Sequence, residues 1–113
     1  MDDCLFCRIV SGDIPASKVY EDDDLIAFHD IDKKAPVHLL IVTKKHIPSV
    51  AETNEEDMGI FTQIMRVAKK LAADFDLKNG FRIVVNTGKD GGQSVGHLHY
   101  HLLGGRHFTW PPG

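Results

Sequence analysis

The chain has 113 residues, a length that fits one domain over residues 1–113. Its composition, 42% hydrophobic and 26% charged, is that of a globular domain and excludes a disordered or fibrous chain. The net charge of −3 disfavours a nucleic-acid partner, and apolar runs such as residues 39–42 are far shorter than the roughly 20 residues that cross a bilayer. Because Met1, Asp2 and Asp3 lack the basic and apolar parts of a secretion signal, we expect a cytoplasmic protein.

The first half of the chain predicts one short helix and three strands. An acidic stretch at residues 21–24 has the composition of a solvated hairpin tip, and apolar segments flank it. The run at residues 39–42 is apolar throughout, as expected for a strand that is buried on both faces. The expected elements are a helical turn within residues 4–12, a hairpin of strands at 19–21 and 25–29, and a strand at 37–43.

One long amphipathic helix follows. Apolar residues recur at spacings of three and four, which predicts a single buried stripe. Thr53 and Glu56 have the spacing of a capping box at its start, and Asn79-Gly80 provides a stop signal. The expected stripe consists of Phe61, Ile64, Met65, Ala68, Leu71, Ala72 and Phe75.

Two further strands are expected at residues 81–85 and 97–103, separated by a glycine-rich segment. Strands on both sides of one helix, joined by hairpin-type connections, predict an α+β domain. We expect a mostly antiparallel, five-stranded sheet that is covered by the long helix, with the short N-terminal helix in addition. A domain of this size has a small core, so self-association or a structural metal would add to its stability.

Three histidines at alternate positions, His97, His99 and His101, carry the strongest functional signal. Side chains along a strand alternate between its faces, so we expect the three imidazoles on one face and the intervening apolar residues on the other. Neighbours two residues apart lie roughly 6.6 Å apart at Cα, close enough to share a ligand, a metal or a proton network. Valines would pack better in such a row, which therefore indicates a functional site.

The segment at residues 88–96, just before this row, contains four glycines. Glycines let backbone amides approach phosphate oxygens closely, although the Gly-Lys-Ser/Thr ending of a P-loop is absent. By itself such a loop could be a plain turn. Beside three imidazoles, and with the Ser94 hydroxyl, it predicts a site for an anion the size of phosphate.

The histidine row, followed by two apolar residues, resembles the signature of the histidine-triad (HIT) family of nucleotide hydrolases and transferases. Other segments resemble its Hint branch, the purine nucleoside phosphoramidases, and the resemblance extends from Phe6 to Gly113. These segments are Ala27-Phe28-His29-Asp30-Ile31, Ala35-Pro36-Val37-His38, Lys44-Lys45-His46-Ile47, Gly91-Gly92-Gln93-Ser94-Val95, Gly104-Gly105-Arg106 and Trp110-Pro111-Pro112-Gly113.

The resemblance implies a HIT-like fold, a homodimer and a defined reaction. The substrate would be a purine nucleoside 5′-phosphoramidate, such as adenosine 5′-monophosphoramidate, whose P–N bond, or the corresponding acyl-phosphate bond, is cleaved to release AMP or GMP. His99 would be the nucleophile, held as one tautomer by a hydrogen bond from its other ring nitrogen, and water would cleave the nucleotidyl-histidine. His101 would contact the phosphate, His38 would orient the nucleophile, and Ser94 and Asn86 would stabilise phosphoryl charge with the loop amides; no cofactor is needed for the chemistry.

By the same resemblance Asp30 would hold the ribose hydroxyls, and Trp110 would lie near the leaving group. Each apolar residue could instead be ordinary core, and Asp30 could be the acceptor of an Asx-turn. The expected nucleotide-binding residues are Phe6, Ile9, Ile14, Phe28, Asp30, Ile31, Asn86, Gly92, Gln93, Ser94, Val95, His99 and His101.

Cys4 and Cys7 form a Cys-x-x-Cys pair, which in a reducing compartment indicates metal ligands, a redox pair or two buried thiols before a disulfide. The pair resembles that of bacterial HIT proteins that carry zinc, which implies His46 and His97 as the other ligands. Zinc with four protein ligands would be structural and would pin the N-terminal segment to the sheet. Strict alternation aims His97 at the same face as His99, so this ligand set requires His97 to depart from the pattern.

Two other classes of function compete. The histidine row could bind a catalytic metal, although no carboxylate follows it in the sequence. The same pocket could also serve a nucleotide-binding module without catalysis. We assign no role to His29 or His107.

Overall fold

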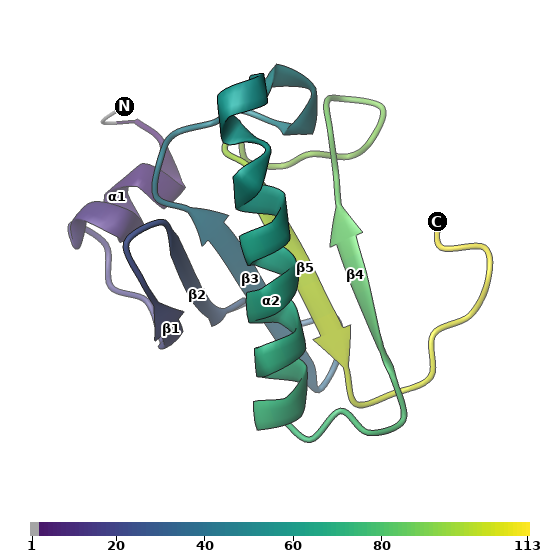
Figure 1. Cartoon of the computed structure of the whole chain (residues 1–113). Helices are drawn as coiled ribbons and strands as arrows, with labels where there is room; N and C mark the ends of the chain where they lie inside the picture. Colours follow the sequence, from purple (N-terminus) through teal and green to yellow (C-terminus); the bar gives the residue numbers. More distant parts are fainter. Residues whose placement is uncertain (1–2) are drawn as a thin grey trace.

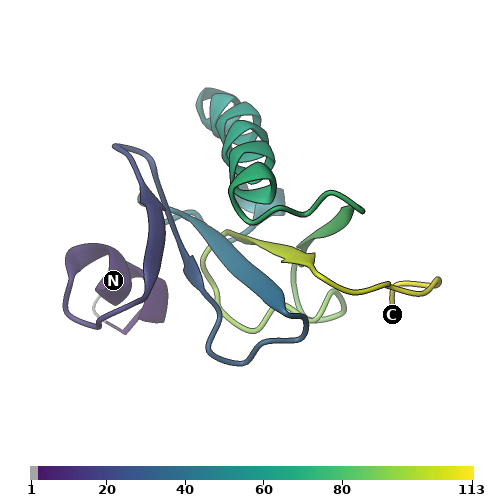
Figure 2. The ribbon, with the colours of Figure 1, turned by 90° about the horizontal axis from the view of Figure 1, so that it is seen from below.

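A computed structural model describes residues 3–113, which form one five-stranded sheet and two helices (Figures 1 and 2). Neighbouring strands are antiparallel throughout, in the order β1-β2-β3-β5-β4, which confirms the predicted α+β class. None of the described helices combines the length and apolarity needed to cross a membrane. The elements are α1 (Leu5–Ser11), β1 (Lys18–Glu21), β2 (Leu25–His29), β3 (Val37–Thr43), 3-10 turns at Val50–Glu52 and Glu55–Asp57, α2 (Gly59–Asp74), β4 (Phe81–Val85) and β5 (His99–Gly104).

The short helix α1 has a cysteine at its start and a glycine at its end. The Cys4 sulfur caps the first turn by accepting a hydrogen bond from the Cys7 amide at 3.4 Å. Gly12 ends the helix with φ +89°, a conformation that glycine adopts without steric cost, as the sequence indicates. Phe6 and Ile9 are its buried side chains.

Each face of the sheet packs against one helix (Figure 2). Alternate residues of β2 and β3 point to opposite faces, so both strands are buried on both sides, as predicted for residues 37–43. The α2 face includes Leu25, Ala27, Leu39, Ile41, Leu98, Tyr100 and Leu102. The α1 face includes Ile26, Phe28, Leu40 and Val42.

The long helix α2 follows the predicted stripe except at one residue. Met65 is 38% exposed, whereas Val67, which the prediction omitted, is buried with Ile64, Ala68, Leu71 and Ala72. Residues three and four positions after Ile64 share its side of the helix, but Met65 is turned about 100° away from it.

Both ends of α2 differ from the prediction. The capping box is formed by Asn54 and Asp57, whose side chains each accept a hydrogen bond from the other's amide, and it caps the 3-10 turn Glu55–Asp57. The helix α2 itself starts at Gly59 without a side-chain cap, and the Thr53 hydroxyl donates to the Val50 carbonyl at 2.8 Å. The helix ends at Asp74, ahead of Asn79-Gly80, because Asp76 takes the left-handed conformation with φ +58°. Aspartate tolerates that conformation better than most residues, so a stop signal was present but was not identified.

The last strand, β5, starts at His99, two residues later than predicted. The amide of Leu98 bonds to the Ile47 carbonyl at 2.6 Å, and the amide of His97 bonds to the Val95 carbonyl at 2.8 Å. His97 therefore lies outside the β-ladder, and its side chain is free of the strand's alternation. Strand β4 has the predicted bounds, 81–85.

Candidate functional site

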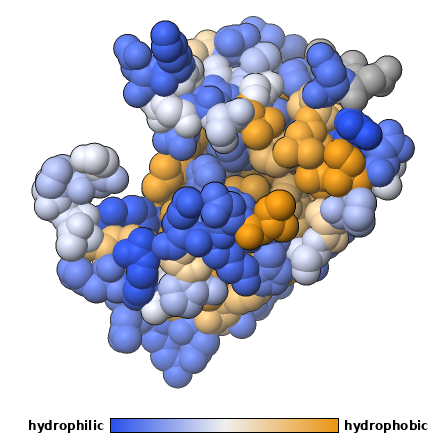
Figure 3. Space-filling model, turned by 180° about the vertical axis from the view of Figure 1, so that it is seen from behind, coloured by the Kyte–Doolittle hydropathy of each residue, from blue (hydrophilic) through white to orange (hydrophobic). Residues whose placement is uncertain are grey.

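A cavity of about 640 Å³ lies on the face of the sheet opposite α2. Figure 3, which views this face, shows apolar residues gathered around a hollow. Many of its lining residues are ones that the sequence predicted to bind nucleotide: Phe6, Ile9, Ile14, Phe28, Asp30, Ile31, Asn86, Gly92, Ser94, Val95, His99 and His101, with His38 beside them. The strand pattern brings them together because α1, β2, β3, β5 and the glycine-rich loop all border this face.

His99 is 4% exposed, and the surrounding backbone determines which of its ring nitrogens carries a proton. Its Nδ1 lies 2.7 Å from the main-chain carbonyl oxygen of His97, and a carbonyl can only accept. Neutral His99 therefore carries its proton on Nδ1 and an unshared electron pair on Nε2. The ring packs edge-on against Phe6, with centroids 4.9 Å apart. This hydrogen bond is the one expected for a nucleophilic imidazole.

A second pair of imidazoles forms a hydrogen-bonded chain beside His99. The Lys34 amide donates to His38 Nδ1 at 3.1 Å, so the proton of neutral His38 is on Nε2. That Nε2 lies 2.9 Å from Nδ1 of His101, which accepts, leaving the proton of His101 on Nε2. The sequence predicted that His38 orients the nucleophile; its hydrogen bond is instead with His101, whose ring centroid is 5.1 Å from that of His99.

Burial keeps this pair uncharged at neutral pH. It lowers the pKa of His101 to about 4, with the neighbouring His99 and His38 contributing in the same direction. Burial also lowers the pKa of His38, against the opposing effect of the Asp30 carboxylate. His101 is thus a neutral hydrogen-bond donor rather than an acid that gives up a proton.

Asp30 forms an Asx-turn and also lines the cavity. Its Oδ1 accepts from the Asp32 amide at 2.9 Å, which is an Asx-turn, and its Oδ2 lies 3.4 Å from His38 Nε2 at the cavity wall. Ligand atoms of Asp30, His38 and His101 lie within 4.8 Å of one another, which suits a cation. However, the 2.9 Å contact between the two imidazoles is a hydrogen bond that uses both nitrogens.

The glycine-rich loop is held in shape by Gln93. Its Oε1 accepts from the Gly88 amide at 2.9 Å, and its Nε2 donates to the carbonyls of Pro48 and Val95 at 2.7 and 2.9 Å. A Cβ at Gly91 would lie 2.4 Å from the Thr87 carbonyl oxygen, so only glycine fits there. Gln93 thus shapes the loop, and it is not among the described residues that line the cavity.

Trp110 is also outside that lining set. It is 82% exposed, on a C-terminal tail that extends past β4 (Figure 1). The lining residues that sequence reasoning missed include Leu5, Ser17, Asp32, Lys34 and Leu40. Leu40 could have been found from its position in β3, where it lies directly opposite Phe28 of β2. The loop residues carry no such signal.

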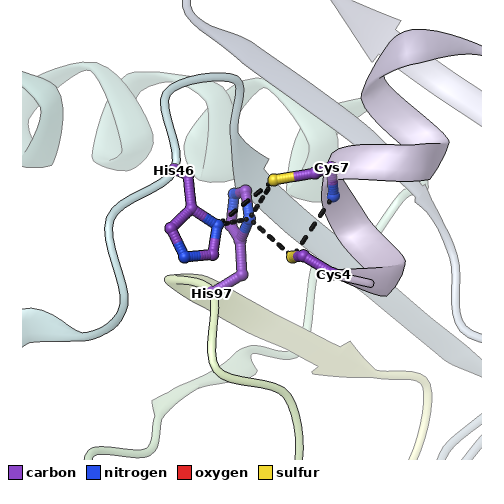
Figure 4. A group of neighbouring side chains, drawn as sticks. All are labelled: Cys4, Cys7, His46 and His97. Atoms are coloured by element: carbon purple, nitrogen blue, oxygen red, sulfur yellow. Dashed lines mark hydrogen bonds between the residues drawn. The ribbon is translucent and has the colours of Figure 1, made fainter. Parts of the chain in front are cut away.

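The four residues of the predicted metal site lie together (Figure 4). Cys4 and Cys7 come from the start of α1, His46 from the loop after β3, and His97 from the residues before β5. Nδ1 of His46 lies 3.2 Å from the Cys7 sulfur and 3.2 Å from Nδ1 of His97. Nδ1 of His97 lies 3.4 Å from the Cys4 sulfur and 3.5 Å from the Cys7 sulfur.

These separations fit one metal ion. Bonds of about 2.0 Å to nitrogen and 2.3 Å to sulfur place tetrahedral ligands roughly 3.3–3.8 Å apart. His97 is fully buried, and its Nε2 donates to the Thr43 carbonyl at 2.6 Å, which leaves the electron pair of Nδ1 directed at the cluster. Such an outer hydrogen bond is typical of metal-binding histidines. Burial, and then the Cys4 side chain, raise the pKa of Cys7 to about 11, so binding a cation displaces a proton from sulfur.

Comparisons with known proteins agree over most of the chain. The family model described as "HIT domain" matches residues 11–108, a stretch that includes the histidine row but neither cysteine. An uncharacterized HIT-like protein from Synechocystis is 45% identical over 112 residues, which are 99% of this chain and 98% of the relative.

Two solved structures show the same fold. A HIT family hydrolase from Legionella pneumophila is 50% identical, with a TM-score of 0.96 over 98% of this chain and 100% of that chain. A histidine triad protein from Clostridium difficile is 44% identical, with a TM-score of 0.93 over 96% of each chain. The sheet, the long helix and the short N-terminal helix described above are therefore a HIT-like arrangement.

Proposed function

The chain belongs to the HIT domain family, and on that premise we propose that it is a purine nucleoside phosphoramidase of the Hint branch. The observation that carries the proposal is the ring of His99, whose Nδ1 proton is held by a carbonyl 2.7 Å away while its Nε2 electron pair is left for the cavity. This is the arrangement that a nucleophilic imidazole requires.

In the first step, the electron pair of His99 Nε2 forms a bond to the α-phosphorus of the nucleoside phosphoramidate. The P–N bond breaks as the N–P bond to His99 forms, and the amine leaves with that electron pair and takes a proton from water. The Nδ1–H of the new nucleotidyl-imidazolium stays hydrogen-bonded to the His97 carbonyl, so the positive charge of the ring lies beside the negative end of a fixed dipole. In the second step, a water oxygen attacks phosphorus, the electron pair of the P–N bond returns to Nε2, and AMP or GMP is released. The proton that the attacking water loses neutralises the hydroxide left by the first step.

The phosphoryl oxygens gain negative charge in both steps. The hydrogen-bonded chain from Lys34 through His38 fixes Nε2 of His101 as a donor, and this donor stays neutral because burial lowers its pKa to about 4. The Ser94 hydroxyl, the Asn86 amide and the loop at Gly92 line the same cavity and supply further donors. Fixed donors of this kind stabilise a transition state because they need no reorientation.

The rest of the cavity suits a nucleoside. Phe6, Ile9, Ile14 and Phe28 give it an apolar wall for the flat base, and Asp30 lies where a carboxylate oxygen can accept from ribose hydroxyls. Ile31 is fully exposed at the cavity edge, where a bound base would cover it.

Zinc is the metal that we propose for Cys4, Cys7, His46 and His97. Two thiolates and two imidazoles are a common zinc ligand set, and four protein ligands leave no open position for a substrate. Bound there, zinc would supply cross-linking of α1 to the residues before β5 and no chemistry on the nucleotide.

A homodimer is also part of the proposal. Strand β4 is an edge of the sheet, and Phe81 on it is 42% exposed. Met65, on α2, is 38% exposed. A second copy that pairs along β4 would cover Phe81, and exposed apolar residues such as these favour self-association. Sedimentation equilibrium of wild type and Phe81→Lys tests this: the wild type should have twice the mass of one chain.

Phosphorus NMR of the protein with adenosine and guanosine 5′-phosphoramidates tests the reaction itself. The proposal predicts that the phosphoramidate signal is replaced by that of the 5′-monophosphate. A protein that binds AMP or GMP by calorimetry but leaves both phosphoramidates intact would be a nucleotide-binding module, and the proposed activity would be wrong.

A further inference from the structure

Besides the ring of His101, 5.1 Å away between centroids, the His99 imidazole has two contacts, and both involve the Cys/His cluster or Phe6, which lies between its cysteines. The first is the hydrogen bond from Nδ1 to the main-chain carbonyl of His97, at 2.7 Å. The second is the edge-on contact with the Phe6 ring, at 4.9 Å between centroids and an angle of 74°. The nucleophile's orientation therefore depends on where His97 and Phe6 are held.

His97 is held through both of its ring nitrogens. Nε2 donates to the Thr43 carbonyl at 2.6 Å, and Nδ1 is directed at the two sulfurs and at His46. A ring that is fixed on both sides, and fully buried, also fixes the main chain of the same residue. The His97 carbonyl that accepts from His99 belongs to that main chain, ahead of β5. The amide of the same peptide group, that of Leu98, donates to the carbonyl of Ile47, the residue after His46.

Phe6 is held through the two cysteines that flank it. Cys4 caps α1, Cys7 lies in its first turn, and Phe6 is 4% exposed between them. The Phe6 ring lies 6.0 Å from the His97 ring and 5.9 Å from Phe28, measured between centroids. Phe6 and Ile9 attach α1 to the sheet by apolar packing, and the two cysteines add a second attachment, to His46 and His97.

We propose that the Cys4/Cys7/His46/His97 cluster, when it holds its metal, positions the nucleophile, with His97 acting through its carbonyl and Phe6 through its ring. His97 and Phe6 are both positioning residues. The cluster therefore does more than stabilise the fold. The inference rests on the proposed role of His99 as nucleophile. The inference adds to the proposed function that metal occupancy governs the rate of attack on phosphorus as well as the melting temperature.

His46→Ala tests the inference. The His46 side chain is not among the described cavity-lining groups, so an effect on His99 must pass through the cluster. The matched control is His107→Ala, which makes the same change at an exposed histidine. Both variants are purified with zinc, and metal content and circular dichroism are recorded for each.

The first readout is the rate of nucleotidyl-enzyme formation in a single turnover at saturating substrate, well below the melting temperature. We expect His46→Ala to lose zinc and to form the intermediate about 10–100-fold more slowly, because a misplacement of about 1 Å at a reacting group can cost about 10²-fold. His107→Ala should behave as wild type. A His46→Ala protein that is folded, free of zinc and unchanged in this rate would overturn the inference, because a purely structural metal predicts that result.

The second readout does not depend on turnover. Long-range proton–nitrogen NMR of the histidine rings at neutral pH reports which nitrogen of His99 is protonated. In the zinc-loaded wild type we expect the Nδ1–H form alone, and in His46→Ala a mixture of both tautomers. An unchanged His99 pattern in the variant would count against the inference even if the rate fell.

Rescue covers the case in which His46→Ala does not fold. His46→Cys offers sulfur in place of nitrogen and is expected to retain zinc and most of the rate; zinc retention with the rate still lost would contradict the inference. If the zinc-loaded wild type forms no intermediate at all, the proposed function has failed, and the NMR comparison still decides whether the cluster orients His99.

Discussion

Two histidines two residues apart, His97 just before β5 and His99 at its start, belong to two regions and have opposite tautomers. In the Cys/His cluster, Nε2 of His97 donates to the Thr43 carbonyl, and the electron pair of Nδ1 is directed at the two sulfurs and His46. In the cavity, Nδ1 of His99 donates to the His97 carbonyl, and the electron pair is on Nε2.

The difference shows that a main-chain carbonyl decides what each imidazole can do. Residues 97 and 99 are both histidines, and both are almost fully buried. Their roles diverge because one carbonyl meets Nε2 and the other meets Nδ1, which selects opposite tautomers. The comparison predicts that changes in the cavity abolish activity but spare stability, whereas changes in the cluster lower both.

Replacing the nucleophile should have the largest effect. His99→Ala removes the atom that bonds to phosphorus, and we expect turnover to fall by at least about 10³-fold. Affinity for AMP should change little, because the apolar wall and Asp30 remain. Steady-state release of the monophosphate and calorimetry of AMP binding measure the two quantities, and normal turnover in this variant would remove His99 from the mechanism.

Removing a cluster thiol should have the next largest effect, on stability. Cys7→Ser deletes one of four ligands, and loss of a metal is among the changes that cost most, so we expect a decrease of about 3 kcal/mol or more in the free energy of unfolding. Urea unfolding of the zinc-loaded proteins measures it. Equal stability of Cys7→Ser and wild type, with zinc present in the latter, would mean that the cluster does not cross-link α1.

Removing the phosphate donor should have a smaller effect on the rate. His101→Ala deletes the Nε2 donor that the His38 chain fixes, and we expect turnover to fall by about 10²-fold, as for other oxyanion donors. His38→Ala should show part of this loss, since the donor remains but its tautomer is no longer fixed. If His38 acted directly on His99, His38→Ala would instead lose more turnover than His101→Ala.

The smallest effect is a pH dependence of stability. Because burial lowers the pKa of His101 from 6.5 to about 4, the unfolded chain binds a proton in this interval that the folded chain does not. The free energy of unfolding should therefore fall as the pH falls from 6.5 toward 4, and burial lowers the pKa of His38 in the same direction. Urea titrations across this range should give a shallower dependence for His101→Ala than for wild type; equal slopes would contradict the assignment.

Much of this architecture was predictable from local patterns. The strand at residues 37–43 follows from its continuous apolar run, the bounds of β4 follow from the turn residues beside it, and the histidine row marks a strand that borders the cavity. The capping box was placed one residue too early because the Thr53 spacing fits as well as that of Asn54, and only the path of the 3-10 turn decides between them. Such a choice depends on tertiary structure.

The partners of each histidine were harder to predict. Sequence alternation gave His97, His99 and His101 one face, but His97 precedes the ladder and turns to the cysteines, an outcome set by hydrogen bonds to Val95 and Ile47. The contact of His38 with His101 joins residues 63 positions apart, and no spacing in the sequence encodes it. Trp110 lies outside the set of cavity-lining residues for a similar reason. The direction of the C-terminal tail depends on tertiary contacts, which the Trp110-Pro111-Pro112-Gly113 motif does not encode.

The central claim is that His99 becomes covalently bonded to phosphorus. Mass spectrometry of protein that is mixed with adenosine 5′-phosphoramidate and quenched within one turnover tests it most directly. The account predicts an added mass of one adenylyl group, located on the peptide that contains His99 and absent from His99→Ala. Turnover without any adduct, or an adduct on another residue, would contradict it.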